Sequence, residues 1–239
     1  MNAMDGSVKR GAEAQDARRD RWSAHRAQRR EEFVAAALRV LAAQGPELPM
    51  DAVAAEAGVT KPVLYRYFAD KAALVEALGD FSSALLLDRL LPAIGSDSAA
   101  LARIRDAVDA YFAVIDEHPN LYWLLARQAA GNGSPDADPV HRNKEFIANS
   151  LSAVIGDYLR AYGLDSGAAE PWGYGLTGMV QSTGEWWMSR RSMSRANVVE
   201  YLTKLIWAAM KGVLAESGIV IEPDQPLPKG RPSARPDPG

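Results

Sequence analysis

Apolar residues recur every three or four positions along most of the chain, which predicts a succession of amphipathic helices. The first pattern begins at Trp22, carries an apolar stripe through Phe33 and Leu41, and ends at Gly45-Pro46. No segment alternates apolar and polar residues over the length of a strand between turn residues. The expected fold class is therefore all-α.

The residues that begin and end helices place the next three elements. A short helix is expected over "PMDAVAAEAG", closed by Gly58. Thr60 can cap the helix that follows, and Pro62 falls in its first turn, where a missing N–H costs nothing. Asp70 is expected to cap a longer helix that stops near Gly95.

The rest of the chain continues the helical pattern. Further helices are expected over 99–118, 119–131, 140–162, 169–190 and 195–217, with a loop at "GNGSPDADP". Four regions follow: a disordered basic arm over 1–20, a three-helix head over 21–70, a larger helical region over 71–220, and a disordered proline-rich tail over 221–239.

Composition narrows the class of protein. At 239 residues and 48% hydrophobic residues the chain can bury a sizeable core. It has no cysteine, which excludes disulfides and thiolate metal sites. No apolar run approaches the ~18 residues of a membrane span, and the N-terminus lacks the apolar stretch of a signal peptide. We expect a soluble, cytoplasmic protein with no membrane partner.

The net charge of −3 is unevenly distributed. Residues 1–71 carry 12 Lys or Arg and 10 Asp or Glu, whereas the remaining residues carry 15 and 20. Basic residues are densest between Lys9 and Arg30, a segment that includes Arg29. A cationic front on an acidic body suits a head that faces phosphates, with Arg29 among its contacts, although a solvated basic tail explains the charge equally well.

The pattern of short helix, tight turn and second helix over 50–67 has the spacing of a helix-turn-helix. Val53, Ala54 and Leu64 are expected to face inward, with Val59 as the buried turn residue. The outer face then carries Lys61, Pro62, Val63, Tyr65, Arg66 and Tyr67. Tyrosine hydroxyls and cations can bond phosphate oxygens, and Pro62 and Val63 can touch thymine methyl groups. For Tyr65 and Phe68, simple packing is the alternative.

Residues 23–78 resemble the DNA-binding domain of the TetR family of transcriptional regulators. The stretch "MDAVAAEAGVTKPVLYRYFADKAALVEAL" carries the resemblance. It implies binding to double-stranded operator DNA, usually as a repressor, with a helical sensor that binds a small molecule and forms a homodimer. By the same resemblance Thr60, Tyr65, Tyr67 and Lys71 contact the DNA backbone, and Lys61, Pro62, Val63 and Arg66 face bases or phosphates. Met50 departs from the family pattern, because it replaces a Thr or Ser that bonds phosphate.

The helices over 169–190 and 195–217 are the expected dimer interface. Gly173, Gly175, Gly178 and Gly184 each cost about 1 kcal/mol in a helix interior, which is tolerated where another backbone approaches closely. The expected interface residues are Trp172, Leu176, Thr183, Trp187, Val198, Leu202, Leu205 and Ala209. A core within one chain is the alternative.

Large apolar side chains of the sensor are candidates for a ligand cavity, although each can equally be plain core. They are Phe81, Leu85, Tyr111, Phe112, Ile115, Trp123, Leu124, Phe146, Ile155 and Met179, joined by the carboxylate of Glu185. Soft Met side chains and rings favour a lipophilic ligand such as a fatty acid or acyl compound. Glu185 leaves a cationic lipophilic drug as the alternative, unless it is simply an exposed carboxylate on the helix surface.

Catalytic chemistry has little support in the sequence. His25, His118 and His141 are isolated, and no pair of histidines has metal-ligand spacing. No glycine-rich phosphate loop and no nucleophile beside an evident base are present. We therefore expect neither an enzyme nor a cofactor or metal. Two further hypotheses remain: an architectural DNA-binding protein without a ligand, and an enzyme acting on acyl compounds.

Overall fold

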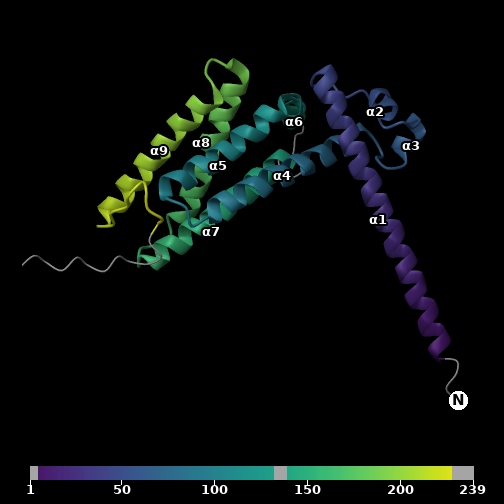
Figure 1. Cartoon of the computed structure of the whole chain (residues 1–239), viewed down its shortest axis with the longest axis horizontal. Coiled ribbons are helices and arrows are strands. Elements are labelled where there is room, and N and C mark those ends of the chain that lie inside the picture. Colours follow the sequence, from purple (N-terminus) through teal and green to yellow (C-terminus); the bar gives the residue numbers. More distant parts are fainter. Residues whose placement is uncertain (1–4, 132–138, 228–239) are drawn as a thin grey trace, which may run out of the picture. The chain divides into compact units, whose positions relative to one another are not determined.

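The computed structural model describes residues 5–131 and 139–227 (Figure 1). Within these ranges every regular element is a helix, so the expected all-α class is confirmed. The helices are α1 (Asp5–Gln44), α2 (Met50–Glu56), α3 (Lys61–Tyr65), α4 (Lys71–Gly95), α5 (Ala100–Glu117), α6 (Pro119–Gly131), α7 (Pro139–Ala161), α8 (Ala169–Arg190) and α9 (Arg195–Glu216). The expected loop at 131–139 lies largely outside the described residues.

The chain divides into two compact units, residues 1–78 and 79–239. The boundary falls inside α4, eight residues after the predicted boundary between 70 and 71, so the first turns of this helix belong to the head and the rest to the sensor. We call the first unit the head and the second the sensor.

Helix α1 begins at Asp5, whereas residues 1–20 were expected to be disordered. The arm is rich in Ala, Arg, Glu and Gln, which are strong helix formers. Because the head helix follows without a Gly or Pro break between 12 and 44, the helix can continue back into the arm. Residues 1–4 lie outside the described part of the chain.

The head has a compact aromatic core. The side chains of Phe33, Leu64, Phe68 and Leu74 are fully buried. The ring of Phe33 meets that of Phe68 edge-on at 6.3 Å between centroids and that of Tyr67 at 5.1 Å. Phe33 of α1 therefore holds the end of α3 in place, which fixes the orientation of a helix only five residues long.

In the sensor α7 packs along α8 and α5 packs along α9. A Cβ atom added at Gly173 would lie 2.8 Å from the carbonyl oxygen of Ala148 in α7, and one at Gly184 would lie 2.6 Å from the ring of Tyr111 in α5. These two glycines allow close approach within one chain. At Gly175 and Gly178 an added Cβ would meet no atom within 4 Å, so the chain itself does not require glycine there.

The tail after α9 corrects a second expectation of disorder, at least over residues 221–227. Ile221 is 2% exposed and packs in a cluster with Tyr162 and Leu214. The carbonyl oxygens of Gln225 and Pro223 accept hydrogen bonds from the first N–H groups of α5, at 2.8 and 3.2 Å. Helix α5 has no side-chain cap, so these carbonyls satisfy donors that its N-terminus leaves open.

Candidate DNA-reading head and ligand cavity

The turn between α2 and α3 has the geometry that the sequence predicts. Gly58 has a φ of +67°, a left-handed conformation that favours glycine. The N–H of Val59 donates to the carbonyl oxygen of Ala54 at 2.9 Å and closes the turn. Thr60 occupies the N-cap position of α3 with an extended backbone, but its side chain makes no capping hydrogen bond, so that part of the expectation is wrong. Its side chain is exposed instead.

Helix α3 presents one buried and one exposed face. Leu64 is fully buried, and the exposed face carries most of the expected DNA contacts. Thr60, Lys61, Pro62, Tyr65, Arg66 and Lys71 are exposed, while Val63, Tyr67 and Arg29 are half-buried. Tyr65 is 40% exposed, so its ring is not a core residue, whereas Phe68 is one. The turn residue Val59 is half-buried rather than buried.

Two arginines of α1 bond to the C-terminal end of the reading helix, a role that was not predicted from the sequence. Arg30 donates to the carbonyl oxygen of Tyr67 at 2.6 Å, and its guanidinium lies 4.3 Å from the ring centroid of Phe68. Arg26 donates to the carbonyl oxygen of Arg66 at 3.4 Å. Both satisfy carbonyls that a short helix leaves unpaired. Their four-residue spacing on the face that carries Phe33 is the signal that could have revealed them.

Two of the basic residues expected to contact DNA form ion pairs with acidic residues of the head. Lys61 pairs with Asp51 of α2 at 2.9 Å, and Arg29 pairs with Glu32. The hydrogen bond that Lys61 donates to the carboxylate of Asp51 raises the pKa of the Lys61 amine, which is therefore cationic at neutral pH. Exposed ion pairs of this kind contribute about 0–1 kcal/mol, so a phosphate can replace the carboxylate at little cost.

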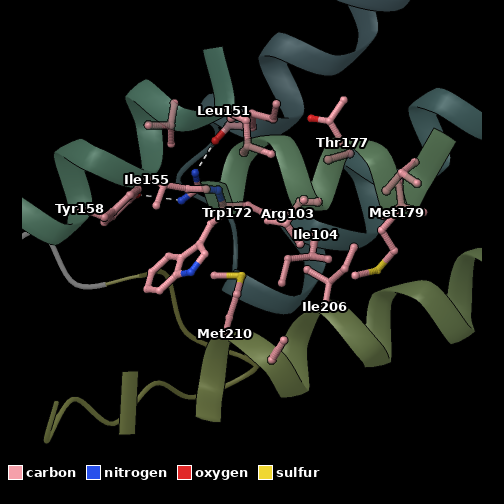
Figure 2. A pocket seen from close by; sticks show the side chains of 18 of the residues that line it. Arg103, Ile104, Leu151, Ile155, Tyr158, Trp172, Thr177, Met179, Ile206 and Met210 are labelled. Carbon is pink, nitrogen blue, oxygen red and sulfur yellow. Dashed lines mark hydrogen bonds between the residues drawn. The ribbon is translucent and has the colours of Figure 1, made fainter. Parts of the chain in front are cut away.

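The sensor has a cavity of about 490 Å³ that is partly open to solvent, a volume typical of small-molecule sites (Figure 2). Its walls come from α4, α5, α7, α8 and α9, with Leu227 of the tail. Most lining side chains are aliphatic or aromatic, among them Leu86, Leu90, Ile94, Ile104, Leu151, Ile155, Trp172, Leu176, Met179, Ile206 and Met210. The site is therefore suited to an apolar ligand body.

Three of the expected ligand residues line this cavity: Tyr111, Ile155 and Met179. The others do not, because the helical turn directs neighbouring side chains to different sides of a helix. Phe112, Ile115 and Leu124 are buried in the packed core, and Trp123, Phe81 and Leu85 are half-buried beside it. Phe146 is 51% exposed, and Glu185 is exposed outside the cavity. Glu185 is therefore not placed to bind a cationic ligand inside this cavity.

The expected dimer residues also separate into groups. Trp187, Val198 and Leu202 are buried against α5, and Trp172, Leu176 and Ala209 line the cavity. Thr183 is half-buried, and its hydroxyl donates to the carbonyl oxygen of Met179 at 2.8 Å. Leu205 is 55% exposed. Buried side chains of one chain cannot contact a partner, so of this set Leu205 is the large apolar side chain that faces solvent, together with the smaller exposed Ala209.

Polar groups of the cavity were not anticipated from sequence. Arg103, Tyr158, Tyr162, Thr177 and Gln181 all line it. Burial raises the pKa of Tyr162 to about 12, so this phenol is a neutral hydrogen-bond donor at physiological pH. A signal was present in the sequence: Arg103 lies four residues before Ala107 on the same face of α5 as Tyr111, a cation in an apolar stripe.

Comparison with protein families decides the identity of the fold. A profile described as the tetracyclin repressor-like C-terminal domain matches residues 89–219, and one described as bacterial regulatory proteins of the tetR family matches residues 33–78. The chain belongs to the TetR family. It is a DNA-binding transcriptional regulator with a helix-turn-helix head and a helical C-terminal domain, and this family is not enzymatic.

Known proteins extend the likeness over most of this TetR-family chain. An uncharacterised HTH-type transcriptional regulator of Mycobacterium tuberculosis is 33% identical over 205 residues, 85% of this chain and 86% of its own. The transcriptional activator FasR of Mycolicibacterium smegmatis is 26% identical over 190 residues, 79% of this chain and 85% of its own.

A solved structure shares the fold. The regulator FadR of Bacillus subtilis, solved in complex with stearoyl-CoA, superposes with a TM-score of 0.56 at 16% identity, covering 73% of this chain and 96% of that one. Within the described residues of this TetR-family regulator, no helix is both long and apolar enough to cross a bilayer.

Proposed function

We propose that this TetR-family regulator is a homodimeric repressor that leaves its operator when a long-chain acyl compound fills the sensor cavity. The observation that carries the proposal is the cavity itself. It is apolar, about 490 Å³ in volume, and walled by five helices of the sensor. That FadR is solved with stearoyl-CoA supports the ligand class, and the activator FasR marks activation as the alternative sign of regulation.

Helix α4 offers a covalent route between the two units. Its residues Lys71–Leu78 belong to the head, and Leu86, Leu90 and Ile94 of the same helix line the cavity. A ligand releases DNA only if it binds one arrangement of the heads better than the other. A tenfold loss of operator affinity needs about 1.4 kcal/mol of coupling, which is within the ordinary allosteric range.

The dimer surface that we propose is a stripe of residues on α8 and α9, here called the α8–α9 surface. It consists of the exposed residues Tyr174, Trp186, Tyr201, Leu205, Ala208 and Gly212, together with the half-buried Gly178. An added Cβ would meet no atom of the chain at Gly178 or Gly212, so close approach of a second chain would explain these glycines. Two recognition helices must lie roughly 34–36 Å apart to occupy successive major grooves, which a dimer can provide.

Replacing Leu205 with Glu tests the surface. We expect Leu205→Glu to be monomeric in analytical ultracentrifugation and to bind DNA weakly, because the dimer would bury an unpaired carboxylate. Ala153→Glu, at an exposed position of α7 outside the α8–α9 surface, is the control and should remain dimeric. A folded dimer of Leu205→Glu would contradict this interface, and a wild-type monomer with full DNA affinity would contradict dimerisation.

The contacts to the DNA backbone are tested by salt dependence. Lys71 is exposed just after the reading helix, where we propose that its amine holds a phosphate. Lys71→Ala should weaken binding to all duplexes alike and reduce the salt slope by about one unit. A change of sequence preference with an unchanged slope would assign Lys71 a different role.

The acyl proposal is tested with a labelled operator and a panel of fatty acids, acyl thioesters and cationic drugs. Long-chain acyl compounds should weaken operator binding at concentrations that leave the fold intact. Calorimetry should show a negative heat-capacity change on binding, because apolar surface is buried. If no acyl compound binds or alters DNA affinity, the proposed function fails, while DNA binding rests independently on the head.

A further inference from the structure

We infer that Arg103 is the anchor for an anionic head group at one end of the cavity ligand, so the ligand is an anionic amphiphile whose hydrocarbon chain fills the apolar part. This inference rests on the proposed function, since it names the chemistry of the molecule that the cavity binds. Figure 2 shows Arg103 reaching in among apolar side chains beside Tyr158.

Arg103 is the one side chain with a formal charge at neutral pH among the described residues of the cavity wall. It donates to the hydroxyl of Tyr158 at 2.8 Å and to the carbonyl oxygen of Ile94. A guanidinium has five N–H donors, so these two bonds leave donors over. No ion pair joins Arg103 to a carboxylate within the described chain. A half-buried cation with neutral partners is stabilised when an anion enters.

The cavity also holds two buried hydroxyls without a partner. Tyr162 and Thr177 both line it, are 2% and 6% exposed, and have hydroxyl oxygens that make no hydrogen bond within the described residues. Two other threonines, Thr183 and Thr203, donate to the carbonyl four residues earlier in their helices. Thr177 does not. An unsatisfied buried hydroxyl is costly, so a hydrogen bond to either oxygen would favour a bound ligand.

Tyr162 belongs to the same end of the cavity as Arg103. The charge of Arg103 counteracts the burial that raises the pKa of this phenol, which means that the two groups are electrostatically coupled. Tyr158 lies between them, since its hydroxyl accepts a hydrogen bond from Arg103 and its ring contacts that of Tyr162 in a tilted arrangement with 6.3 Å between centroids. One cation and a neutral phenol donor together form a site for a carboxylate or phosphate, the acceptors that arginine binds in bidentate fashion.

The remaining wall fits a hydrocarbon chain. Lining residues on α8 run from Pro171 to Gln181, which at about 1.5 Å per residue is a length of about 15 Å. Among the residues that the structure describes, no Asp or Glu lines the cavity, so a cationic ligand would meet Arg103 without a compensating carboxylate. An anion at Arg103 with a long apolar tail therefore matches both the charge and the apolar lining of the cavity.

The test compares ligands that differ only in the head group. Full-length protein is titrated with stearate, its uncharged methyl ester, stearylamine and stearoyl-CoA, following the fluorescence of tryptophan, since Trp172 lines the cavity. We expect stearate to bind about 10- to 100-fold more tightly than methyl stearate, the gain of a charge-assisted hydrogen bond. Arg103→Met should weaken stearate much more than methyl stearate and so remove most of that difference, and Arg103→Lys should keep part of it.

The outcomes separate this inference from the proposed function. Methyl stearate that binds as tightly as stearate and releases DNA would overturn the anionic anchor and leave the proposed function standing. Binding of stearoyl-CoA alone, lost in Arg103→Met, would support the anchor with phosphate as its source. Absence of binding by every probe would overturn both. Circular dichroism checks the fold of each variant. If Arg103→Met does not fold, the comparison of stearate with methyl stearate in the wild-type protein and in Tyr162→Phe decides the question. We expect Tyr162→Phe to weaken the binding of stearate more than that of its ester.

Discussion

Gly173 lies at a close approach of α8 to α7, and a single methyl group there should push the two helices apart. A Cβ atom would lie 2.2 Å from the hydroxyl oxygen of Ser152 and 2.8 Å from the carbonyl oxygen of Ala148. The Ser152 side chain can rotate, although it would lose its 2.7 Å hydrogen bond to the same carbonyl. The backbone carbonyl of Ala148 cannot move unless α7 moves with it.

The magnitude follows from two opposing effects. Overpacking costs about 1–3 kcal/mol, and the upper part of this range applies because the clash is with backbone. Replacing glycine by alanine in a helix returns about 1 kcal/mol. We therefore expect Gly173→Ala to lower the free energy of unfolding by about 1–2 kcal/mol, which corresponds to a fall in Tm of about 2–8 °C for a unit of this size. Thermal and urea unfolding followed by circular dichroism measure both.

A matched control lies in the facing helix. A Cβ at Gly156 of α7 would come within 3.1 Å of Arg160 only at the end of its flexible side chain. Gly156→Ala should therefore be neutral or stabilising by up to about 1 kcal/mol. If Gly173→Ala unfolds at the same temperature as wild type, the close spacing of α7 and α8, and with it the shape of the cavity that they wall, is wrong.

Three further predictions concern the head, the tail and the cavity. Asp70 accepts the N–H of Ala73 at 2.8 Å, so Asp70→Ala should lose about 1 kcal/mol in urea unfolding while Asp70→Asn keeps most of it; equal losses would argue against a cap. Ile221→Ala should cost about 2–5 kcal/mol and exposed Val220→Ala under about 0.5, and a tail that is unpacked in solution would make both neutral. Burial raises the pKa of Tyr162 from 10.0 to about 12, so between these pH values the native state keeps a proton that the unfolded chain loses. The free energy of unfolding should therefore fall as the pH rises from 10 to 12, and it should fall less steeply in Tyr162→Phe. The same slope in both proteins would contradict the burial of this phenol.

Local signals explain why the head and the helix boundaries could be predicted from the sequence. The turn at Gly58 needs a left-handed residue, Asp70 provides a cap, and Gly131 ends α6, all of which depend on one or two neighbouring residues. The expected spans of α8 and α9 agree with the structure to within one residue. The same short-range chemistry identified the DNA-reading motif, whose residues lie within 30 positions of one another.

The sequence does not show which surface each apolar helix face packs against. An apolar stripe shows that a helix face is buried but not against what, so Trp187 and Val198 were assigned to a dimer and lie in the core. Trp172 was assigned there too and lines the cavity. The tail was misjudged because proline content indicates disorder, whereas Ile221 packs through contacts with residues far away in sequence. Composition carries no information about such long-range contacts.

Selection of binding sites from a random duplex library by the full-length protein, with and without stearate and stearoyl-CoA, tests most directly whether this chain is a ligand-controlled DNA-binding regulator. The geometry of a dimeric helix-turn-helix protein predicts enrichment of an inverted repeat with half-site centres about one helical turn or a multiple of it apart. Ligand at concentrations that fill the cavity should reduce recovery of that sequence at least tenfold. Enrichment of no sequence would contradict specific DNA reading, and an enriched repeat recovered equally with and without every acyl ligand would contradict control by the sensor.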